Sequence, residues 1–270
     1  MKLPAKVKLW DVLTQAVADM TKYGFDSPDR LQGWISKLRD AATQDAGTQA
    51  HAVQRLRLSL GVLYTRWVSN GAILKYHPGI ERTTLKVIDP RLRAVLDRRI
   101  LASADLIKLN REQAIEKTLS RFSGWATSIP SGGSKIVDRL DVKSHVAKAM
   151  RSYSFEERRL YIDQGHRLIA NVSAVIAEQT GAIGFFWRHV HQLNYDGRPE
   201  HEERDKKFYV IRDSWAMQRG LMKRGPNPYS DEIDMPAQKI FCRCWAEYAD
   251  SLKDVPDENL TEKGREAKSL

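Results

Sequence analysis

The spacing of apolar residues changes near residue 181, and this change constrains the fold more than any other feature of the sequence. Up to about residue 180, apolar residues recur every three or four positions, as in Leu9, Leu13 and Val17. That period places them on one face of a helix. From Ile183 onward, β-favouring aromatic residues and alternating patterns replace it. We therefore predict an α+β fold, in which a mostly helical N-terminal body precedes a small α+β C-terminal module.

Helix-capping residues and apolar spacing divide the first 180 residues into several predicted helices. Ser27-Pro28 is an N-cap followed by proline at the first helical position, and Ser154–Glu157 has the pattern of a capping box. The turn-rich segment 128–134 indicates a flexible connection, after which helices resume. Helices are expected near residues 9–20, 28–38, 48–69, 91–100, 111–125 and 155–179.

The alternating region and the residues after it complete the predicted domain organisation. Strands are expected near residues 184–191, 207–211 and 239–248. Beyond residue 250 the sequence is polar and has few apolar anchors, which is typical of a poorly ordered terminus. We predict a helical, basic body at 1–180, an α+β module at 181–250 and a weakly ordered tail at 251–270.

Positive charge is concentrated in the predicted body. The chain has a net charge of +10, and residues 1–180 contain 29 Lys and Arg against 18 Asp and Glu, whereas 181–270 contain 15 against 16. Such an excess favours an anionic partner, because phosphate binding gains affinity from counterion release without any base-reading motif. We expect nonspecific DNA contact, or docking of the basic helices on an acidic protein surface. The candidate DNA-binding residues are Arg91, Arg93, Arg98 and Arg99.

The cysteine pattern and the absence of long apolar segments exclude two classes of protein. Only one residue separates Cys242 from Cys244, so a disulfide between them would be strained and would close almost no loop. The N-terminus lacks an apolar signal core, and polar residues interrupt the longest apolar stretch, around residues 58–74. We therefore expect a cytoplasmic protein that does not associate with membranes.

An ordered series of residues is the most specific motif in the sequence. It consists of Trp187, Asp196-Gly197-Arg198-Pro199-Glu200-His201, Arg204-Asp205, Pro236 and Cys242-Arg243-Cys244. In these residues the chain resembles the phage Mu F-like minor head family, whose module has a tryptophan strand, an Asp-x-Arg-x-x-x-His motif or a close variant, and a Cys-Arg-Cys segment. The resemblance covers about residues 185–245. It extends more weakly to the helix at 155–179, where Gly165–Asn171 departs from the family pattern.

The resemblance implies a structural function in a virion. The protein would be a minor capsid protein of phage head morphogenesis, inside the head near the portal and in the host cytoplasm during assembly. Its partners would be the portal protein, major capsid or scaffold proteins, and phage genomic DNA. The structural cluster of the module would comprise Trp187, Asp196, Arg198, His201, Cys242, Arg243 and Cys244.

Two versions of this cluster are consistent with its residue types. In the first, which needs no cofactor, Asp196 accepts hydrogen bonds at a tight turn and the thiols pack without metal. In the second, His201, Cys242 and Cys244 supply three ligands to one zinc ion. The fourth zinc ligand would then be His189, His191 or Asp196.

Both versions require the two halves of the motif to meet in space. Ordering a turn that carries Asp, Arg and His is costly unless each polar group finds a partner, and the Cys-Arg-Cys strand offers suitable groups. On a strand, Arg243 projects to the opposite face from both thiols, where it can pair with Asp196 or Asp205. We therefore predict that Asp196, Arg198 and His201 converge with the Cys-Arg-Cys segment.

A metal-dependent nuclease or hydrolase is the alternative function. Glu200-His201-Glu202-Glu203 combines carboxylates with a histidine, and such groups can hold a metal and activate water. A charged, solvated turn explains the same residues. The sequence contains no Gly-rich phosphate loop, Gly-x-Ser-x-Gly elbow or His-Glu-x-x-His motif. We therefore expect no catalytic residues.

Overall fold

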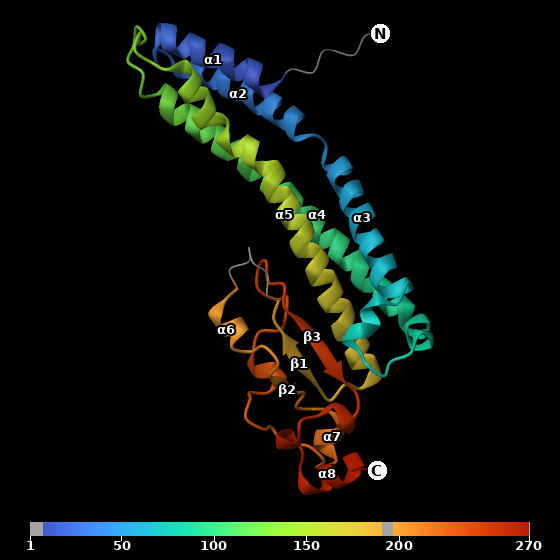
Figure 1. Cartoon of the computed structure of the whole chain (residues 1–270). Helices are drawn as coiled ribbons and strands as arrows, with labels where there is room; N and C mark the ends of the chain where they lie inside the picture. The colour runs from blue at the N-terminus through green and yellow to red at the C-terminus, as the bar shows by residue number, and fades with distance from the viewer. Residues whose placement is uncertain (1–7, 191–196, 270) are drawn as a thin grey trace. The chain divides into compact units, whose positions relative to one another are not determined.

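The computed structural model describes residues 8–190 and 197–269, and it has the predicted α+β class (Figure 1). Long helices precede a small antiparallel sheet that lies in the C-terminal part of the chain. Contacts divide the chain into two compact units, each built from two separate stretches of sequence. Unit 1 comprises Met1–Leu56 and Ala102–Leu160, and unit 2 comprises Arg57–Leu101 and Tyr161–Leu270.

The helices of the first 180 residues are fewer and longer than the sequence predicts. They are α1 (Leu9–Tyr23), α2 (Pro28–Ala46), α3 (Gln49–Tyr64), α4 (Arg82–Ala126) and α5 (Arg139–Thr180), with the π-helical turn η1 (Thr65–Ser69) and the 3₁₀ turn η2 (Ala72–Tyr76) after α3. The predicted start of α2 is confirmed, because the Ser27 hydroxyl accepts the backbone N–H of Arg30 and Pro28 opens the helix. The two helices expected at 91–100 and 111–125 are one helix.

Two predicted helix boundaries were wrong for identifiable reasons. Asn110 does not start a helix, because Ile107 and Ala114 are buried on either side of it and the apolar stripe continues. Residues 154–157 lie inside α5, where Glu157 pairs with Arg111 and does not cap a helix end. The helix begins after Asp138, whose carboxylate accepts the backbone N–H groups of residues 140 and 141.

Unit 1 has an apolar core formed by helix faces. Leu13, Val17 and Met20 of α1 pack in one cluster with Leu38 of α2 and Phe122 of α4, and these side chains are almost completely buried. Each buried side chain of this size contributes roughly 1.5–3 kcal/mol of transfer free energy. Repeated helical apolar spacing therefore accounts for most of the cohesion of unit 1.

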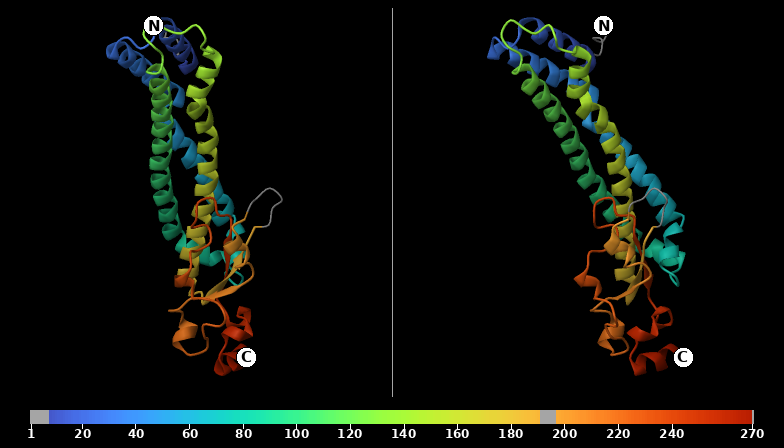
Figure 2. Two further views of the ribbon diagram at one scale, coloured as in Figure 1. Left: turned by 90° about the vertical axis from the view of Figure 1, so that its left-hand side faces the viewer. Right: turned by 60° about the vertical axis from the view of Figure 1, so that its left-hand side comes forward.

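The turn-rich segment 128–134 packs against the end of α1 and forms part of unit 1. The backbone N–H of Phe25 donates to the Ile129 carbonyl, and that of Gly132 donates to the Tyr23 carbonyl. Both views of Figure 2 show this loop next to α1. Gly24 has a φ of 72°, and a Cβ placed there would lie 1.8 Å from the Pro130 carbonyl oxygen. The contact therefore requires glycine for both its conformation and its size.

Unit 2 contains the three-stranded sheet. Its strands are β1 (Gly184–Arg188), β2 (Phe208–Val210) and β3 (Trp245–Ala249), in the order β2-β1-β3 and antiparallel throughout. The three predicted strands are thus confirmed, with narrower bounds. The short helical elements around them are α6 (Pro199–Glu202), α7 (Trp215–Gln218), η3 (Ser230–Glu232), η4 (Leu252–Asp254), η5 (Asp257–Asn259) and α8 (Glu262–Ser269).

The predicted domain boundaries differ from the contact units of the structure. Residues 57–101 are helical but belong to unit 2, because aromatic side chains from them pack against the sheet. The Tyr76 ring lies 4.8 Å from that of Trp245, and His77 stacks on Tyr248 at 5.1 Å. Sequence spacing shows that a helix has an apolar face, but it does not show which element covers that face.

The expected weakly ordered tail was also wrong. Leu252, Val255 and Leu260 are buried in a cluster with Ile183 and Val210 of the sheet region. The few apolar residues of the tail thus cover this cluster, and Asn259 is buried beside them, where its Nδ2 donates to the Arg224 carbonyl. Among the described residues, no helix combines the length and apolar composition needed to cross a bilayer.

Candidate metal centre

Two histidines and two cysteines meet at one end of the sheet. His189 follows β1, and Cys242 and Cys244 precede β3, while His201 lies in α6. The strand register explains part of this meeting: Arg188 pairs with Trp245, so the next residues outward, His189 and Cys244, face each other. The predicted convergence of His201 with the Cys-Arg-Cys segment is therefore seen in the structure.

The donor atoms of these four residues are close together and buried. The Cys242 Sγ lies 3.4 Å from the His201 Nδ1, and the Cys244 Sγ lies 3.6 Å from the same nitrogen. The Cys244 Sγ is also 3.4 Å from the His189 Nδ1. Residue exposures are 1% for His201, 1% for Cys242, 3% for Cys244 and 8% for His189. The donor atoms of His201, Cys242 and Cys244 all lie within 4.8 Å of one another, so these three residues can hold a metal ion.

These separations agree with the edges of a zinc coordination tetrahedron. With Zn–S bonds of about 2.3 Å and Zn–N bonds of about 2.0–2.1 Å, tetrahedral angles give S···N edges of about 3.5 Å. The three sulfur–nitrogen distances above are 3.4, 3.6 and 3.4 Å. Four donors of the Cys₂His₂ type are a common structural zinc set. His201, Cys242 and Cys244 therefore fit three positions of such a site in both chemistry and spacing, and His189, next to Cys244, is the candidate for the fourth.

The opposite ring nitrogens of both histidines face carboxylates. The His201 Nε2 lies 3.2 Å from the Asp234 Oδ2, and the His189 Nε2 lies 3.8 Å from the Glu202 Oε1. The 3.2 Å contact of His201 favours the tautomer with its proton on Nε2, which leaves the Nδ1 lone pair available for a metal, whereas 3.8 Å at His189 is too long for a hydrogen bond. Metal-ligating histidines in proteins almost always have such an outer partner.

Asp234 is itself held as a carboxylate. Its Oδ1 accepts a hydrogen bond of 2.8 Å from the Arg204 Nη1, and the Lys239 Nζ lies 3.7 Å from its Oδ2. Partial burial alone would raise the pKa of Asp234, but the Arg204 hydrogen bond and the two positive charges hold it below its ordinary value. The residue that orients His201 is therefore ionised at neutral pH.

The two thiols share a proton. A hydrogen bond from Cys244 lowers the pKa of Cys242 to about 5, and the same bond raises the pKa of Cys244. The pair thus favours ionisation of Cys242 over Cys244. Thiolate is the form that ligates zinc.

Trp187 packs against the histidine that joins the two halves of the motif. Its side chain is completely buried, and its ring meets the His201 ring edge to face with 5.0 Å between centroids. The Arg204 guanidinium lies 5.0 Å from the Trp187 ring centroid. The tryptophan therefore restricts the rotation of His201 and covers the cluster with an apolar surface.

The remaining predicted cluster residues have separate roles. The Arg198 Nη2 donates to the Ile240 carbonyl at 2.9 Å and so links the turn to the loop before Cys242. Asp196 and His191, both candidate ligands, lie outside the described residues. Asp205 accepts the backbone N–H of His189 at 2.7 Å. The Cys-Arg-Cys segment was expected to be a strand but precedes β3, and Arg243 lines a cavity together with His166.

The glutamates around His201 do not point toward the sulfur atoms. The Glu200 Oε1 forms an ion pair with the Lys239 Nζ at a distance of 2.9 Å. Glu202 and Glu203 are exposed. His201 is the buried member of this short helix, and its Nδ1 faces the thiols. The geometry is that of a charged turn with one inward residue.

Asp163 and Asp234 are site residues that sequence reasoning missed. The Asp163 Oδ1 accepts the backbone N–H of Phe241 at 2.7 Å, which fixes the loop before the cysteines on α5. Phe241 has a φ of 59°, an unusual conformation for a residue with a side chain. Asp163 is one of several acidic residues on a helix, and Asp234 lies in a loop, so no sequence pattern distinguishes either of them.

The four arginines predicted to contact DNA do not share one surface. Arg91, Arg93 and Arg98 are exposed on α4, and Arg93 forms a 2.6 Å ion pair with Asp89. Arg99 is partly buried, donates to the Gln164 Oε1 at 3.1 Å and lines the cavity. Arg99 therefore differs from the other three in its burial and in lining the cavity.

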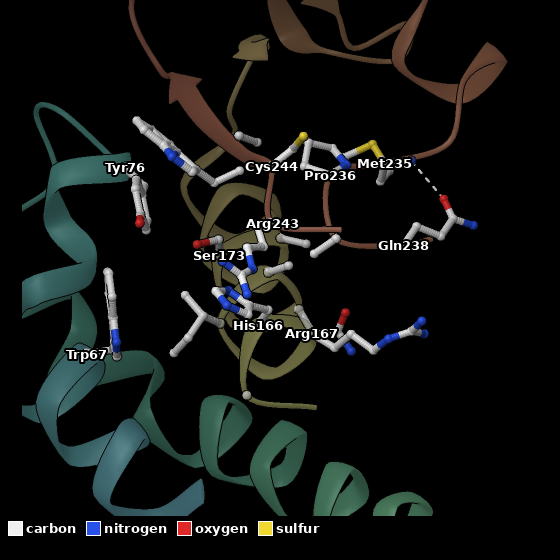
Figure 3. Close-up of a pocket in the computed structure, with 18 of the residues that line it drawn as sticks. Trp67, Tyr76, His166, Arg167, Ser173, Met235, Pro236, Gln238, Arg243 and Cys244 are labelled. Carbon is white, nitrogen blue, oxygen red and sulfur yellow. Dashed lines mark hydrogen bonds between the residues drawn. The ribbon is translucent and has the colours of Figure 1, made fainter. Parts of the chain in front are cut away.

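The cavity lies entirely within unit 2 and has a volume of about 880 Å³ (Figure 3). Trp67 and Tyr76 form one wall. His166 and Ser173 of α5 lie across from them, and Arg243 lies beside these two residues. Cys244 also borders it, so the Cys-Arg-Cys segment separates the metal-type cluster from this space.

No protein-family model, curated protein or solved structure matches the chain.

Proposed function

We propose that the chain is a phage minor head protein whose C-terminal module is held together by one structural zinc ion. The observation that carries the proposal is the convergence of His201, Cys242 and Cys244, which belong to the Mu F-like series, with His189 as a fourth donor. Zinc would bind through two thiolates and two Nδ1 atoms. It would tie β1, α6 and the segment before β3 together.

A structural role for the ion rests on His189 acting as the fourth ligand, next to Cys244. Catalytic zinc sites keep one position open for water or substrate, whereas structural sites have four protein ligands. Here all four donor residues are buried, and Trp187 covers His201. For the same reason we do not favour a nuclease or hydrolase centred on His201 and the nearby glutamates.

Metal analysis of the purified full-length protein tests the zinc part of the proposal. We expect one zinc per chain, and we expect it to be lost in Cys242→Ser/Cys244→Ser and strongly reduced in His189→Ala. His51→Ala, which changes an exposed histidine of unit 1, should keep the full zinc content. Protein that contains no zinc after expression and purification with the metal supplied would refute this part.

Cobalt substitution tests the identity of the ligands. Co²⁺ bound by two thiolates and two imidazoles in a tetrahedron gives intense visible bands and a thiolate charge-transfer band. His189→Cys should retain tetrahedral cobalt and strengthen the thiolate band, whereas His189→Ala should weaken both. An unchanged spectrum in both variants would remove His189 from the ligand set.

The virion part of the proposal is supported by the Mu F-like series and by the excess of basic residues in the helices. The protein would act near the portal in head assembly, where it would contact the portal protein, major capsid or scaffold proteins, and packaged DNA. Arg91, Arg93 and Arg98 are exposed and are the residues of the predicted set that can reach a phosphate backbone. DNA contact of this kind would be nonspecific.

Deleting the reading frame from its phage or prophage tests this role. We expect a few copies of the chain in purified wild-type virions by quantitative mass spectrometry, and particles with reduced packaged DNA or infectivity after deletion. Expression of the chain from a plasmid should restore infectivity. Virions that lack the chain, together with an unaffected deletion mutant, would refute the assignment.

A further inference from the structure

We propose that the cavity in unit 2 binds a nucleotide-class ligand, in which a planar base lies on the aromatic wall and a phosphate group meets the cationic wall (Figure 3). The inference is separate from the zinc ion and from the virion role, because it rests on the residues that line the cavity. The free volume of about 880 Å³ falls within the roughly 300–1,000 Å³ of pockets that enclose small organic ligands.

The aromatic wall offers a flat surface. Trp67 and Tyr76 stack with 5.4 Å between centroids and 12° between planes, and Trp245 packs on Tyr76 at 4.8 Å. The Lys75 Nζ lies 4.6 Å and 4.8 Å from the Trp67 and Tyr76 centroids, which helps to fix both rings. A planar base can extend such a stack, and stacking on aromatic side chains is tolerant of base identity.

The opposite wall carries positive charge. Arg99, Arg167, Arg243 and His166 all line the cavity, and its lining among the described residues includes no aspartate or glutamate. The nearest carboxylate, Asp163, is buried and already accepts the Phe241 backbone N–H and the Arg167 Nε. Basic side chains therefore outnumber acidic ones among the described residues that line the cavity.

The cations of this wall act on one another. Burial and the nearby Arg167 lower the pKa of Arg99, and burial and the nearby Arg243 lower the pKa of His166. Positive charges held close to one another are destabilised, and an anion bound beside them would reduce this effect. A single carboxylate cannot accept hydrogen bonds from all three guanidinium groups. A phosphate dianion has more acceptor oxygens and can accept hydrogen bonds from several of them.

Polar groups between the two walls complete the match to a nucleotide. Asn171 and Ser173 line the cavity along α5, and Ser173 lies across from Tyr76 in Figure 3. An amide and a hydroxyl can donate to or accept from a sugar or a base edge. The shared chemistry is a base joined to a phosphate, which either a free mononucleotide or the 5′ end of a DNA strand supplies.

Titration calorimetry with zinc-replete full-length protein tests the assignment. The probes are adenosine monophosphate, adenosine, inorganic phosphate, and a short single-stranded oligonucleotide with and without a 5′ phosphate. We expect saturable binding of adenosine monophosphate and at least about tenfold weaker binding of adenosine and of phosphate, since each lacks one of the two contacts. Tighter binding of the 5′-phosphorylated oligonucleotide than of the mononucleotide would identify a strand end as the source.

Two results would overturn the proposal. One is the absence of binding by the mononucleotide and by both oligonucleotides at millimolar concentration. The other is binding of inorganic phosphate as tight as that of the mononucleotide, which would show that the aromatic wall contributes nothing. Because the metal content of the same protein sample is measured separately, failure of this proposal is distinguishable from failure of the zinc proposal.

Matched variants locate the binding in the cavity. Trp67→Leu and Arg243→Gln should each weaken adenosine monophosphate about tenfold, and Arg243→Lys should recover part of that loss. Trp10→Leu, in unit 1, and Arg66→Gln, which changes an exposed neighbour of Trp67, should stay within about twofold of wild type. Equal losses in the cavity variants and in these controls would contradict the location. Zinc content and thermal unfolding of each variant exclude a folding defect as the cause.

Discussion

The two units bury polar groups in different ways. In unit 1, Arg111 and Glu157 form an ion pair of 3.0 Å between two long helices whose apolar faces already supply a core. In unit 2, the buried polar group is the cluster of two histidines and two cysteines at the edge of a three-stranded sheet. A small sheet buries little apolar area of its own, so its cohesion depends more on such a cluster. Side-chain chemistry should therefore control the stability of unit 2 more than that of unit 1.

Removal of zinc should give the largest difference between the units. Structural zinc sites contribute apparent binding free energies on the order of 10 kcal/mol at neutral pH, and their loss commonly unfolds the surrounding module. We expect a chelator to abolish amide hydrogen-exchange protection in β1 and β3, while α1 and α2 of unit 1 remain protected. Equal loss of protection in both units, or no loss in either, would contradict the expectation that unit 2 depends more on zinc than unit 1 does.

The buried ion pair of unit 1 should give the next largest effect. Arg111→Met leaves Glu157 buried, although the Arg55 Nη2 remains 3.5 Å from it, and also removes donors to the carbonyls of Gly47 and Thr48. We expect a loss of about 3 kcal/mol in the free energy of unfolding. The double variant Arg111→Met/Glu157→Leu should recover most of it.

Arg39 provides the control for this prediction. It pairs with Glu116 on the surface of the same unit, where both side chains are about half exposed. Arg39→Met should change the unfolding free energy by less than about 1 kcal/mol, because surface ion pairs contribute little. Chemical denaturation of the three variants measures the differences, and a cost of Arg39→Met equal to that of Arg111→Met would contradict the argument.

Two glycines that end helices of unit 1 allow the stability cost of a strained backbone conformation to be compared with the cost of a steric clash. Gly24 and Gly47 have φ angles of 72° and 74°, but only at Gly24 would a Cβ meet neighbouring backbone, at 1.8 Å. Gly47→Ala should cost about 1 kcal/mol for its conformation alone. Gly24→Ala should cost about 2–3 kcal/mol, because the 128–134 loop must also move. Equal costs in thermal or chemical unfolding would show that the loop contact contributes no stability.

His77 should give a smaller effect that appears only as the pH falls. Burial lowers its pKa to about 4, its ring stacks on Tyr248, and neither ring nitrogen has a hydrogen-bond partner among the described residues. Below the unfolded-state pKa of about 6.5, the unfolded chain binds a proton that the folded chain does not, so stability falls. Between pH 7 and pH 5 this loss amounts to about 2 kcal/mol.

The variant His77→Phe isolates this contribution. Phenylalanine keeps an aromatic ring against Tyr248 but cannot be protonated, so unit 2 of the variant should lose about 2 kcal/mol less than wild type over this pH range. Hydrogen exchange at the two pH values measures the effect in each unit. An identical pH dependence in both proteins would mean that His77 is protonated in the folded state as well.

The sequence supports the fold class because apolar periodicity is a local property. The period change near Ile183 correctly separates helices from strands. The Ser27 cap is recognisable from the adjacent residues Ser27 and Pro28. The merging of two predicted helices across Asn110 was missed, because burial on both sides of that residue outweighs its preference for a helix end. The packing of residues 57–101 with the sheet is a long-range property that periodicity does not contain.

The candidate site was partly predictable for a related reason. His201, Cys242 and Cys244 are recognisable because their residue types carry specific chemistry, whereas the strand expected at Cys242–Cys244 begins only at Trp245. Selecting His189 over other candidates required the pairing of β1 with β3. Asp163 and Asp234 are ordinary acidic residues whose roles depend on tertiary contacts 78 and 33 positions away along the chain.

The order of the strands has a consequence for the synthesis of the chain. β1 is central in the sheet, yet both of its partners follow it in sequence, and β3 is the last of the three to be made. Until residue 249 has left the ribosome, one edge of β1 has no partner strand and both histidines lack their thiol neighbours. Closure of the sheet is thus a late, long-range step, which makes it slow relative to helix formation. A chain released before β3 is made would therefore expose an unpaired, apolar strand edge that is prone to aggregation.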